Sequence, residues 1–484
     1  MILYAVLRAI TGIALRWFYR DVSIRYANRV PRDTPLLLAV NHPNALVDAL
    51  VVGWALPRRL TITAKATLFG NPVLGWFLHI AGVVPLRRAS DERKHRAEIG
   101  TAGGTLSPVR PGYVDETRNV EAFRAILERL EKCGAVLIFP EGKSHDEPAL
   151  APLRTGPARI ALQAQSEGRV NGLAILPIGL VFEQKEAPRS RVLVDIGEPL
   201  YVDQWIMTAD NAARVEALTA EINRRLHEVT LNYATADEAA LTRGLARVFA
   251  SLLNDPLSIG RDRPLEAEVE LERQLAQARR VLESETTEPA LHARAERLLE
   301  RLATFERTLC AERIVLDDVA ISLGSHHGIR FAIRESSVLA MLGPVALWGR
   351  VNHWLPFRLA RSLGERDITS RDQPAMRTIL AGLSFVLLFY GLATVAMTYV
   401  AGGVVAALYL VSLPLAADID LRFTARMRQA RQRMHAFVHF HRKPELRRQL
   451  LTEHRWLVQE IGEVGRLLEW QRASRGSHPK VPTS

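Results

Sequence analysis

Cysteine is scarce in this chain. Its 484 residues include only two cysteines, Cys133 and Cys310, which lie far apart and not at a metal-binding spacing. A disulfide framework and a cysteine-based zinc site are therefore not indicated. Scarce cysteine fits a catalytic domain in a reducing compartment, and we expect this domain to face the cytoplasm.

Acidic residues are outnumbered, and no nucleic-acid-binding motif accompanies the excess of positive charge. The formal net charge is +11, from 63 Lys and Arg against 52 Asp and Glu. A basic balance indicates nucleic acid, an anionic membrane or an anionic substrate as the partner. Because long apolar runs are present, we expect membrane lipids and a phosphate-bearing substrate, and no nucleic acid. Hydrophobic residues make up 48% and charged residues 24%, which excludes a disordered chain.

The pattern of a cleaved signal peptide is also lacking. Residues 1–20 are apolar but carry Arg8, Arg16, Trp17 and Tyr19. A signal peptide would place positive charge before its apolar core and small residues after it. Aromatic and basic anchors on an apolar helix are typical of a membrane surface, so we expect an interfacial N-terminal helix. An ordinary packed N-terminal helix is the alternative.

Residues 21–230 alternate between strand-like and helix-like segments. Most of the connections between these segments are short. This alternation predicts an α/β domain with a mainly parallel sheet and flanking helices. The expected strands are 35–40, 60–64, 82–86, 135–139, 174–181 and 191–195, and the expected helices are 45–55, 71–80, 118–132 and 155–166.

The stretch 36–50 carries the residues that point to chemistry. An apolar strand ends just before His42, a proline breaks it, and a helix follows with Asp48 in its first turn. Asn44 is the expected N-cap of that helix. A neutral imidazole takes a proton from an alcohol when a carboxylate holds its tautomer and stabilises the imidazolium. The pattern therefore predicts His42 as a general base oriented by Asp48, although a structural histidine near a helix N-terminus is the commoner case.

Three more blocks follow in a set order. They are a segment that ends in Val84-Pro-Leu-Arg87, the segment Phe139-Pro-Glu-Gly142, and an apolar block with proline at 174–180. In order and spacing the four blocks resemble those of the glycerolipid acyltransferases of the 1-acylglycerol-3-phosphate acyltransferase superfamily. The resemblance covers residues 20–230. It implies that an NH-x-D block, a V-P-x-R block, an FPEG-S block and the apolar block line one site.

This chain departs from the superfamily pattern in two ways, and both departures resemble features of one branch of the superfamily. The first block is spaced H-x5-D instead of H-x4-D, and a loop at 43–44 can absorb the extra residue. The third block reads FPEGKSH at 139–145, without the usual arginine, and Asp146 follows it. Both features resemble the eukaryotic-type glycerol-3-phosphate/dihydroxyacetone-phosphate acyltransferases. That branch also has a helical insert and membrane spans after its catalytic domain.

The resemblance implies which cations bind the acceptor's phosphate. Arg87 ends the second block and is the expected ligand, because arginine binds phosphate bidentately. Lys65 and Arg154 are second choices, and Arg88 is expected to face solvent. Lys143 stands where the third block lacks its usual charge, although a surface lysine is its ordinary interpretation.

The resemblance also implies roles for uncharged and acidic residues. Glu141 helps to bind the acceptor or to hold the site together, and Gly142 allows close approach of the backbone. The block with Ile175 and Pro177 lines an acyl groove or belongs to the ordinary core. No metal and no cofactor are expected, since the co-substrate is an acyl thioester of coenzyme A or acyl carrier protein.

Residues 231–335 and 418–484 read as helical additions. The first segment carries Glu, Arg, Leu and Ala at helical spacing, which predicts a helical insert with a hairpin at 264–313. Its charges are most simply solvated helix faces. The second segment is a basic C-terminal tail that we expect to lie against anionic headgroups.

Residues 336–417 form the expected membrane region. The apolar segment 337–358 contains an arginine and a histidine, so we expect a re-entrant or interfacial segment here instead of a span. The run 378–417 has no charged residue and is long enough for two crossings. Gly402-Gly403 near its middle and arginines at both ends predict a transmembrane hairpin whose ends face the cytoplasm.

These features predict a membrane-bound O-acyltransferase of phospholipid biosynthesis. It would move a fatty acyl group from a thioester to the hydroxyl of glycerol 3-phosphate or 1-acylglycerol 3-phosphate. A lysophospholipid-remodelling acyltransferase with another acceptor is the alternative in this class. A non-catalytic membrane scaffold is the alternative from another class, and the presence of His42, Asp48, Arg87 and Glu141 argues against it. The sequence leaves the acceptor, the acyl donor and the oligomeric state open.

Overall fold

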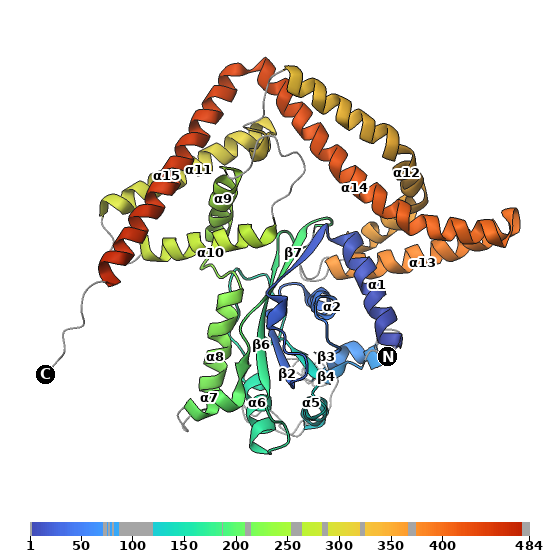
Figure 1. Cartoon of the computed structure of the whole chain (residues 1–484), viewed down its shortest axis with the longest axis vertical. Coiled ribbons are helices and arrows are strands. Elements are labelled where there is room, and N and C mark those ends of the chain that lie inside the picture. The colour runs from blue at the N-terminus through green and yellow to red at the C-terminus, as the bar shows by residue number, and fades with distance from the viewer. Residues whose placement is uncertain are drawn as a thin grey trace, which may run out of the picture. The chain divides into compact units, whose positions relative to one another are not determined.

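A computed structural model describes most of the chain in two compact units. The first unit comprises residues 1–232 with 364–379, and the second comprises 233–363 with 380–484. The first is built on a β-sheet and the second consists of helices (Figure 1). The described residues are 2–70, 75, 78–79, 82–86, 120–185, 187–208, 214–252, 264–282, 289–319, 325–365 and 374–476.

The sheet confirms the predicted α/β class. Its eight strands follow the order β1-β7-β6-β2-β5-β3-β4, with β8 paired to β6. All neighbouring pairs are parallel except β6 with β7 and β6 with β8. The strands are β1 (Asp21–Arg25), β2 (Leu36–Val40), β3 (Leu60–Lys65), β4 (Val84–Leu86), β5 (Ala135–Ile138), β6 (Ala174–Phe182), β7 (Arg191–Ile196) and β8 (Leu200–Tyr201).

Two strands, β1 and β8, were not predicted from the sequence. β1 has the sequence DVSIR, with a charged residue at each end, and it pairs only with β7 at the edge of the sheet. β8 has only two residues. Neither strand carries the apolar run that identifies a strand buried on both faces, so their pairing partners define them. Of the helix expected at 71–80, only residues 75, 78 and 79 are described, and all three are helical.

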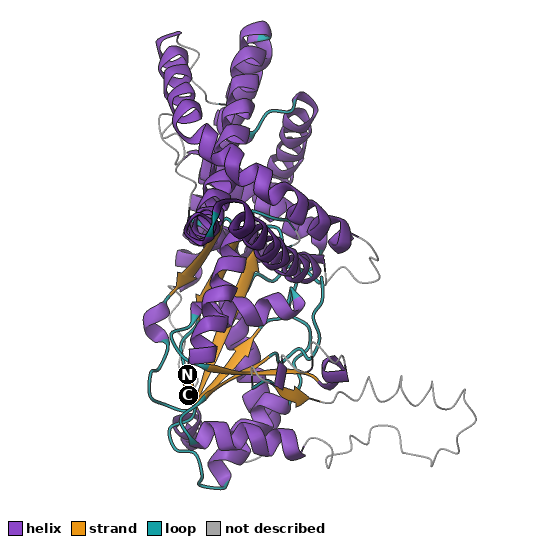
Figure 2. Cartoon of the chain, turned by 90° about the vertical axis from the view of Figure 1, so that its right-hand side faces the viewer, coloured by secondary structure: helices purple, strands orange, loops and turns teal. Residues whose placement is uncertain are grey.

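Helices lie beside the strands of the sheet (Figure 2), and the central strand β2 packs into a hydrophobic core on each of its two faces. Leu36, Leu38 and Val40 pack toward α1 and α2, whereas Leu37 and Ala39 pack toward α5, α6 and α8. Successive side chains of a strand point to opposite faces, so burial on both sides requires a continuous apolar run. The helices and short 3-10 turns of this unit are α1 (Ile2–Phe18), η1 (Ala27–Arg29), α2 (Ala45–Ala55), η2 (Ala66–Gly70), α5 (Val120–Glu131), α6 (Gly156–Ser166), α7 (Val202–Thr208) and α8 (Arg214–Val229).

The N-terminal helix α1 packs by one face against α2. The Arg8 guanidinium donates a hydrogen bond to the Trp54 carbonyl oxygen (3.0 Å), and Leu15 is buried in the core. On another face of the same helix, Val6 and Ile13 are each 47% exposed. The helix is therefore docked on the domain and also presents apolar side chains outward.

The second unit has its own core between the insert and the C-terminal helix. Leu298 and Leu302 of α11 pack with Leu450 and Leu457 of α15 and with Phe440 of α14. The two helices expected at 264–313 are present as α10 and α11, but α10 packs mainly on α9 and α11 mainly on α15, and the expected turn lies outside the described residues. The elements of this unit are α9 (Ala236–Leu252), α10 (Leu265–Leu282), α11 (Pro289–Glu312), η4 (Leu316–Asp318), α12 (Ser325–Glu365), α13 (Pro374–Ala401), α14 (Gly403–Arg442) and α15 (Pro444–Gly476).

Three helices are long and apolar enough to cross a membrane. They lie at Gly328–Leu363 in α12, Ala381–Ala401 in α13 and Gly403–Arg442 in α14. α13 and α14 meet at Gly402, whose φ of 84° lies in the left-handed region that glycine adopts readily (Figure 1). The helical pair and its glycine turn thus fall where the hairpin was expected.

The segment 337–358 is not a broken or re-entrant chain, because it belongs to the continuous helix α12. The two residues that counted against a span both have partners. Arg350 pairs with Asp420 of α14 at 2.9 Å, and the Nε2 atom of His353 hydrogen-bonds the Tyr390 hydroxyl of α13 at 2.7 Å. Paired polar groups are tolerated far better near hydrocarbon than isolated ones. The composition of this segment therefore does not by itself exclude a span.

Candidate active site

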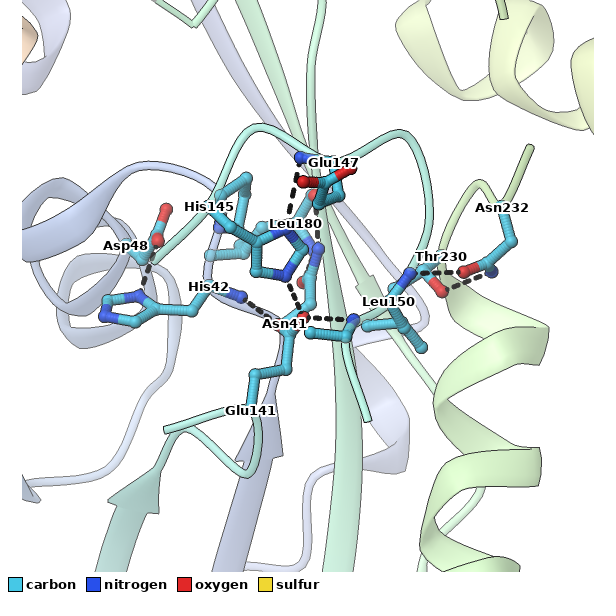
Figure 3. A network of polar contacts seen from close by, with 12 residues as sticks. Asn41, His42, Asp48, Glu141, His145, Glu147, Leu150, Leu180, Thr230 and Asn232 are labelled. Atoms are coloured by element: carbon cyan, nitrogen blue, oxygen red, sulfur yellow. Dashed lines mark hydrogen bonds and ion pairs between the residues drawn. The ribbon is translucent and has the colours of Figure 1, made fainter. Parts of the chain in front are cut away.

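The site begins where the central strand ends. Just past β2, the Asn41 side-chain amide bridges to β6, donating to the Leu180 carbonyl oxygen (3.1 Å) and accepting from the Leu180 N–H (2.7 Å). These two hydrogen bonds fix the position of Asn41, the first residue after the strand. Because carboxyl ends of parallel strands meet at one sheet edge, residues that follow β2 and β5 lie together here (Figure 3).

His42 and Asp48 form the pair that the sequence predicts. Nδ1 of His42 lies 2.9 Å from Oδ2 of Asp48, which is fully buried in the first turn of α2. A carboxylate can only accept, so Nδ1 carries the proton and the Nε2 lone pair is left for chemistry. Within the part of the chain that the structure describes, Nε2 takes part in no hydrogen bond. The imidazole is thus held in the tautomer that a general base requires.

An aromatic ring sets the plane of the imidazole. The Phe139 ring, directly after β5, stacks on the His42 ring with centroids 3.8 Å apart and planes 13° apart. His42 is therefore held at Nδ1 by a carboxylate and across its face by a ring. Only small rotations of the imidazole remain compatible with both contacts.

The backbone has an unusual conformation at the start of α2, within the H-x5-D segment. Ala45 has a φ of 47°, a left-handed conformation that is uncommon for a residue other than glycine. Asn44 occupies the N-cap position as expected, although its side chain makes no capping hydrogen bond. The Asp48 carboxylate accepts the Asn44 N–H instead (2.8 Å). One carboxylate therefore orients His42 and also receives an amide at the helix start.

The Asn44 side chain has a different task, which is to anchor the loop. Its Nδ2 donates to the Tyr19 hydroxyl and to the Lys185 carbonyl oxygen, both at 3.1 Å. The Lys185 ammonium in turn donates to the Pro43 carbonyl oxygen (3.0 Å) and pairs with Asp146. The loop 42–45 is thereby tied to the segment after β6 and, through Asp146, to the third sequence block.

Burial dominates the ionisation of Asp48. Its enclosure raises the pKa of this carboxyl above that of an ordinary aspartate, and the hydrogen bond and charge of His42 act in the opposite direction. Its second oxygen, Oδ1, has no hydrogen-bond partner among the described residues. A carboxylate that is poorly solvated interacts strongly with a nearby imidazolium. Asp48 is thus set to favour the protonated state of His42 that forms when it accepts a proton.

Glu141 holds the loop of His42 from the third block. The side chain is 3% exposed, and its Oε1 accepts the His42 backbone N–H (2.8 Å). Its Oε2 accepts the Ala151 N–H (2.8 Å) and contacts Nε2 of His145. Gly142, with a φ of 75°, supplies the turn that follows. Because protein donors occupy both oxygens, this geometry favours the role of holding the site together over direct contact with the acceptor.

The structure describes only some of the residues that are expected to bind phosphate. Lys65 is the last residue of β3 and pairs in register with Leu86 of β4. Arg87 and its neighbour Arg88 follow β4 directly and lie outside the described residues. Lys143 and Arg154 are both exposed, and the Arg154 N–H donates to the Pro140 carbonyl oxygen (2.7 Å). Their phosphate roles stay predictions.

Ile175 and Pro177 lie in the core of the domain. Both belong to β6 and are buried, and Ile175 packs in the cluster that joins the sheet to α5, α6 and α8. Pro177 lies against Gly197, where a side chain would meet its ring at 2.7 Å. The sequence left groove and core open for this block, and this placement favours the core.

Several residues of the site carry no strong signal in the sequence. Tyr19, Phe139 and Lys185 act on the loop through contacts that sequence spacing does not reveal. His145, the last residue of the third block, and Asp146, which follows it, were noted in the sequence only as part of the block comparison. In the described part of the chain, no group of three or more His, Cys, Asp or Glu side chains is arranged to hold a metal ion.

Comparisons with known proteins agree with this geometry. A family model described as Acyltransferase matches residues 21–181. Glycerol-3-phosphate O-acyltransferase 2 of Saccharomyces cerevisiae is 32% identical over 166 residues, which are 34% of this chain and 21% of that protein. Glycerol-3-phosphate O-acyltransferase 1 of the same yeast is 22% identical over 320 residues, covering 63% of this chain and 40% of that protein.

A plant enzyme and a bacterial structure are also similar. A chloroplastic 1-acyl-sn-glycerol-3-phosphate acyltransferase of Brassica napus is 24% identical over 209 residues, which are 42% of this chain and 51% of that protein. The crystal structure of the 1-acyl-sn-glycerophosphate acyltransferase of Thermotoga maritima covers 46% of this chain and 79% of its own, at 18% identity and a TM-score of 0.32, too low to carry an argument.

These similarities concern the catalytic domain more than the whole chain. The chain spans between 21% and 51% of the length of the three relatives named above. The matched region nevertheless contains all four sequence blocks and the buried His42–Asp48 pair. Residues 21–181 therefore form an acyltransferase domain, which is similar to the corresponding parts of these glycerolipid acyltransferases.

Proposed function

We propose that this protein transfers a fatty acyl group from an acyl thioester to a hydroxyl of glycerol 3-phosphate or 1-acylglycerol 3-phosphate. The observation that carries the proposal is the His42–Asp48 pair, whose proton lies at Nδ1 and whose Nε2 is directed away from the carboxylate (Figure 3). An alcohol is a poor nucleophile until a base accepts its proton. A base of this kind allows an alcohol to attack a thioester.

The chemical step follows from that pair. Nε2 of His42 accepts the hydroxyl proton as the hydroxyl oxygen attacks the thioester carbonyl carbon, and a C–O bond forms. The tetrahedral intermediate then collapses, the C–S bond breaks, and the imidazolium returns the proton to the departing thiolate. Asp48 stabilises the imidazolium between these two events. General base catalysis of this kind contributes roughly 10²- to 10⁴-fold to a rate.

The acceptor class rests on the relatives and on charge. The printed names of the yeast and plant relatives specify glycerol 3-phosphate or its 1-acyl derivative as acceptor. Both molecules carry a phosphate monoester, and the cations expected to bind it are Arg87, Lys65, Lys143 and Arg154, which lie in or near the same blocks. Arginine and lysine are the side chains that bind phosphate groups. The acyl donor is an acyl thioester of coenzyme A or of acyl carrier protein.

The second unit supplies a membrane anchor. Most of the large apolar side chains that are exposed lie on α12, α13 and α14, including Met341 at 79%, Tyr399 at 88%, Val400 at 85% and Val404 at 77%. Apolar surface of this extent indicates a lipid environment. The last three residues flank or approach the Gly402 turn, so the tip of the hairpin is its most exposed apolar part.

The packing of the second unit limits how many helices cross. α11 precedes the three apolar helices and α15 follows them, and the two pack together, with Arg294 and Arg301 of α11 bonded to Glu460 and Glu453 of α15. Both ends of the apolar region therefore lie on one side of the membrane, which requires an even number of crossings. We infer that the hairpin α13–α14 crosses and that α12 does not, with the catalytic domain facing the cytoplasm, where acyl thioesters are made.

A panel of acceptors tests the function. The purified full chain is incubated with one long-chain acyl-CoA and with glycerol 3-phosphate, 1-acylglycerol 3-phosphate, dihydroxyacetone phosphate or lysophospholipids, and products are read by mass spectrometry. We expect acylation of a phosphate monoester acceptor and its loss by roughly 10²-fold or more in His42→Ala. Acylation of a lysophospholipid alone would favour the remodelling enzyme. No product with any acceptor, from coenzyme A or carrier-protein thioesters, would support the scaffold.

A further inference from the structure

The loop that carries the proposed base has no regular structure of its own. Residues 41–44 lie between β2 and α2, and Ala45 has a left-handed backbone. Besides the contacts of Asn41 and Asn44, its position is set by the segment 139–145 of the third block. That segment contacts His42 in three ways: Phe139 stacks on its ring, Glu141 accepts its N–H, and His145 donates its own N–H to the His42 carbonyl oxygen (3.4 Å).

The His145 side chain completes this arrangement in one defined tautomer. The Glu147 backbone N–H points at Nδ1 of His145 at 3.2 Å, so Nδ1 must be the acceptor nitrogen (Figure 3). The proton of the neutral imidazole therefore lies on Nε2, which donates to Oε2 of Glu141. Two backbone amides and this N–H then surround the Glu141 carboxylate, and a buried carboxylate needs such donors.

We propose that His145 is a positioning residue for His42, which acts by holding the Glu141 carboxylate where it captures the His42 amide. The proposal rests on the proposed function for its kinetic consequence and on the geometry alone for its structural consequence. His145 contacts the backbone of His42 directly, through its own N–H, and indirectly, through Glu141. Among the described residues, no hydrogen bond joins the two imidazole rings. His145 therefore acts on where the base sits.

Removal of the His145 imidazole should displace His42. In His145→Ala, Oε2 of Glu141 keeps only the Ala151 amide, and the carboxylate is free to rotate toward solvent that enters the vacated space. Rotation releases the His42 N–H, which has no other acceptor among the described residues. A small displacement of a catalytic group lowers the rate of the chemical step, while substrates that bind elsewhere keep their affinity.

The first experiment separates kcat from KM. We expect His145→Ala to lower kcat by about 10- to 100-fold with KM for donor and acceptor nearly unchanged. His145→Gln places an amide N–H at the reach of Nε2 and should recover most of the lost kcat. His145→Asn is too short to reach Glu141 and should resemble His145→Ala. The control is His227→Ala, an exposed histidine of α8 bonded to its own helix at the Asn223 carbonyl oxygen (2.8 Å).

The second experiment does not depend on activity. Hydrogen–deuterium exchange of the full chain reports whether the amides of residues 41–48 are protected, because the His42 N–H is bonded in the native state. We expect faster exchange of this segment in His145→Ala, with near-native exchange in His145→Gln and in His227→Ala. Peptides of the distant strand β7 serve as an internal reference for overall folding.

The outcomes are distinct. A kcat of His145→Ala within twofold of the wild type, or unchanged exchange in residues 41–48, overturns the positioning role. Equal losses in His145→Ala and His145→Gln also overturn it, because the donated N–H would then be irrelevant. If His145→Ala does not fold, the contrast between the Gln and Asn variants decides. A wild-type protein with no transferase activity contradicts the proposed function, and the exchange experiment still tests the positioning role.

Discussion

At the scale of single residues, Asp48 serves function at the expense of stability. The side chain is fully buried, one of its oxygens lacks a partner among the described residues, and burial raises its pKa. A folded-state pKa above the unfolded value means that the stabilising contribution is present at low pH and is lost as pH rises through the folded pKa. At the pH where His42 acts as a base, the ionised Asp48 therefore disfavours folding.

Asp48→Asn should separate these two effects. We expect activity to fall roughly 10³-fold, because an amide neither fixes the tautomer of His42 nor stabilises its imidazolium. The unfolding free energy of the variant should meet or exceed that of the wild type, and its advantage should grow as pH rises. Denaturant unfolding across a pH series measures this, with the exposed Asp21→Asn as control. A variant that loses stability equally at every pH would contradict this account of Asp48.

Arg87 should act on substrate binding instead of on the base. We expect Arg87→Ala to raise KM for the phosphate-bearing acceptor by about 10- to 100-fold, the range for loss of a charge-assisted hydrogen bond. The KM for the acyl donor should change little, and Arg88→Ala, one position on, should leave both unchanged. Steady-state kinetics with each substrate varied in turn provides the measurement. Equal rises for both substrates would indicate a structural role for Arg87.

At the scale of elements, the site depends on how closely α8 approaches β6. A side chain built at Gly179, next to the Leu180 that holds Asn41, would lie 1.9 Å from the Val229 carbonyl oxygen at the end of α8. A backbone atom cannot move aside as a flexible side chain can. Glycine at this position therefore permits the contact of helix and strand beside the candidate active site.

Gly179→Ala should consequently disturb both stability and the site. We expect a loss of about 2 kcal/mol or more in unfolding free energy, since overpacking against backbone forces the element to shift. Gly53→Ala is the matched control, because a side chain at Gly53 in α2 meets nothing within 4 Å and alanine favours a helix. Thermal unfolding in detergent compares the two variants. Equal midpoints for both would show that α8 and β6 are not as close as described.

At the scale of the whole molecule, the packing of α11 on α15 is the basis for our proposal of an even number of membrane crossings. Cysteine labelling from each face tests this after Cys133 and Cys310 are replaced. We expect single cysteines at Ala311, Ser370 and Gln429 to react from the cytoplasmic face and one at Gly403 only from the opposite face. Ala311 and Ser370 lie on either side of α12, so opposite labelling of these two would show that α12 crosses.

Much of this protein is determined by local sequence. β2 and α2 were predictable because an apolar run buried on both faces, a proline and an acidic first turn lie within a few positions of one another. The apolar helices α13 and α14 were predictable because a long run without charged residues is typical of helices that can cross a membrane. The pairing of His42 with Asp48 follows from the same short-range geometry.

Only the tertiary structure decided the contacts that make the pair useful. The bond from the His42 N–H to Glu141 joins residues 99 positions apart, and Lys185 lies 142 positions from the Pro43 carbonyl it contacts. No local pattern encodes such contacts, because they depend on which strands become neighbours in the sheet. The same reason placed Ile175 in the core, gave Arg350 its partner on α14, and identified the edge strand β1. Periodicity records which face of an element is buried, whereas the identity of what covers that face is a property of the assembled fold.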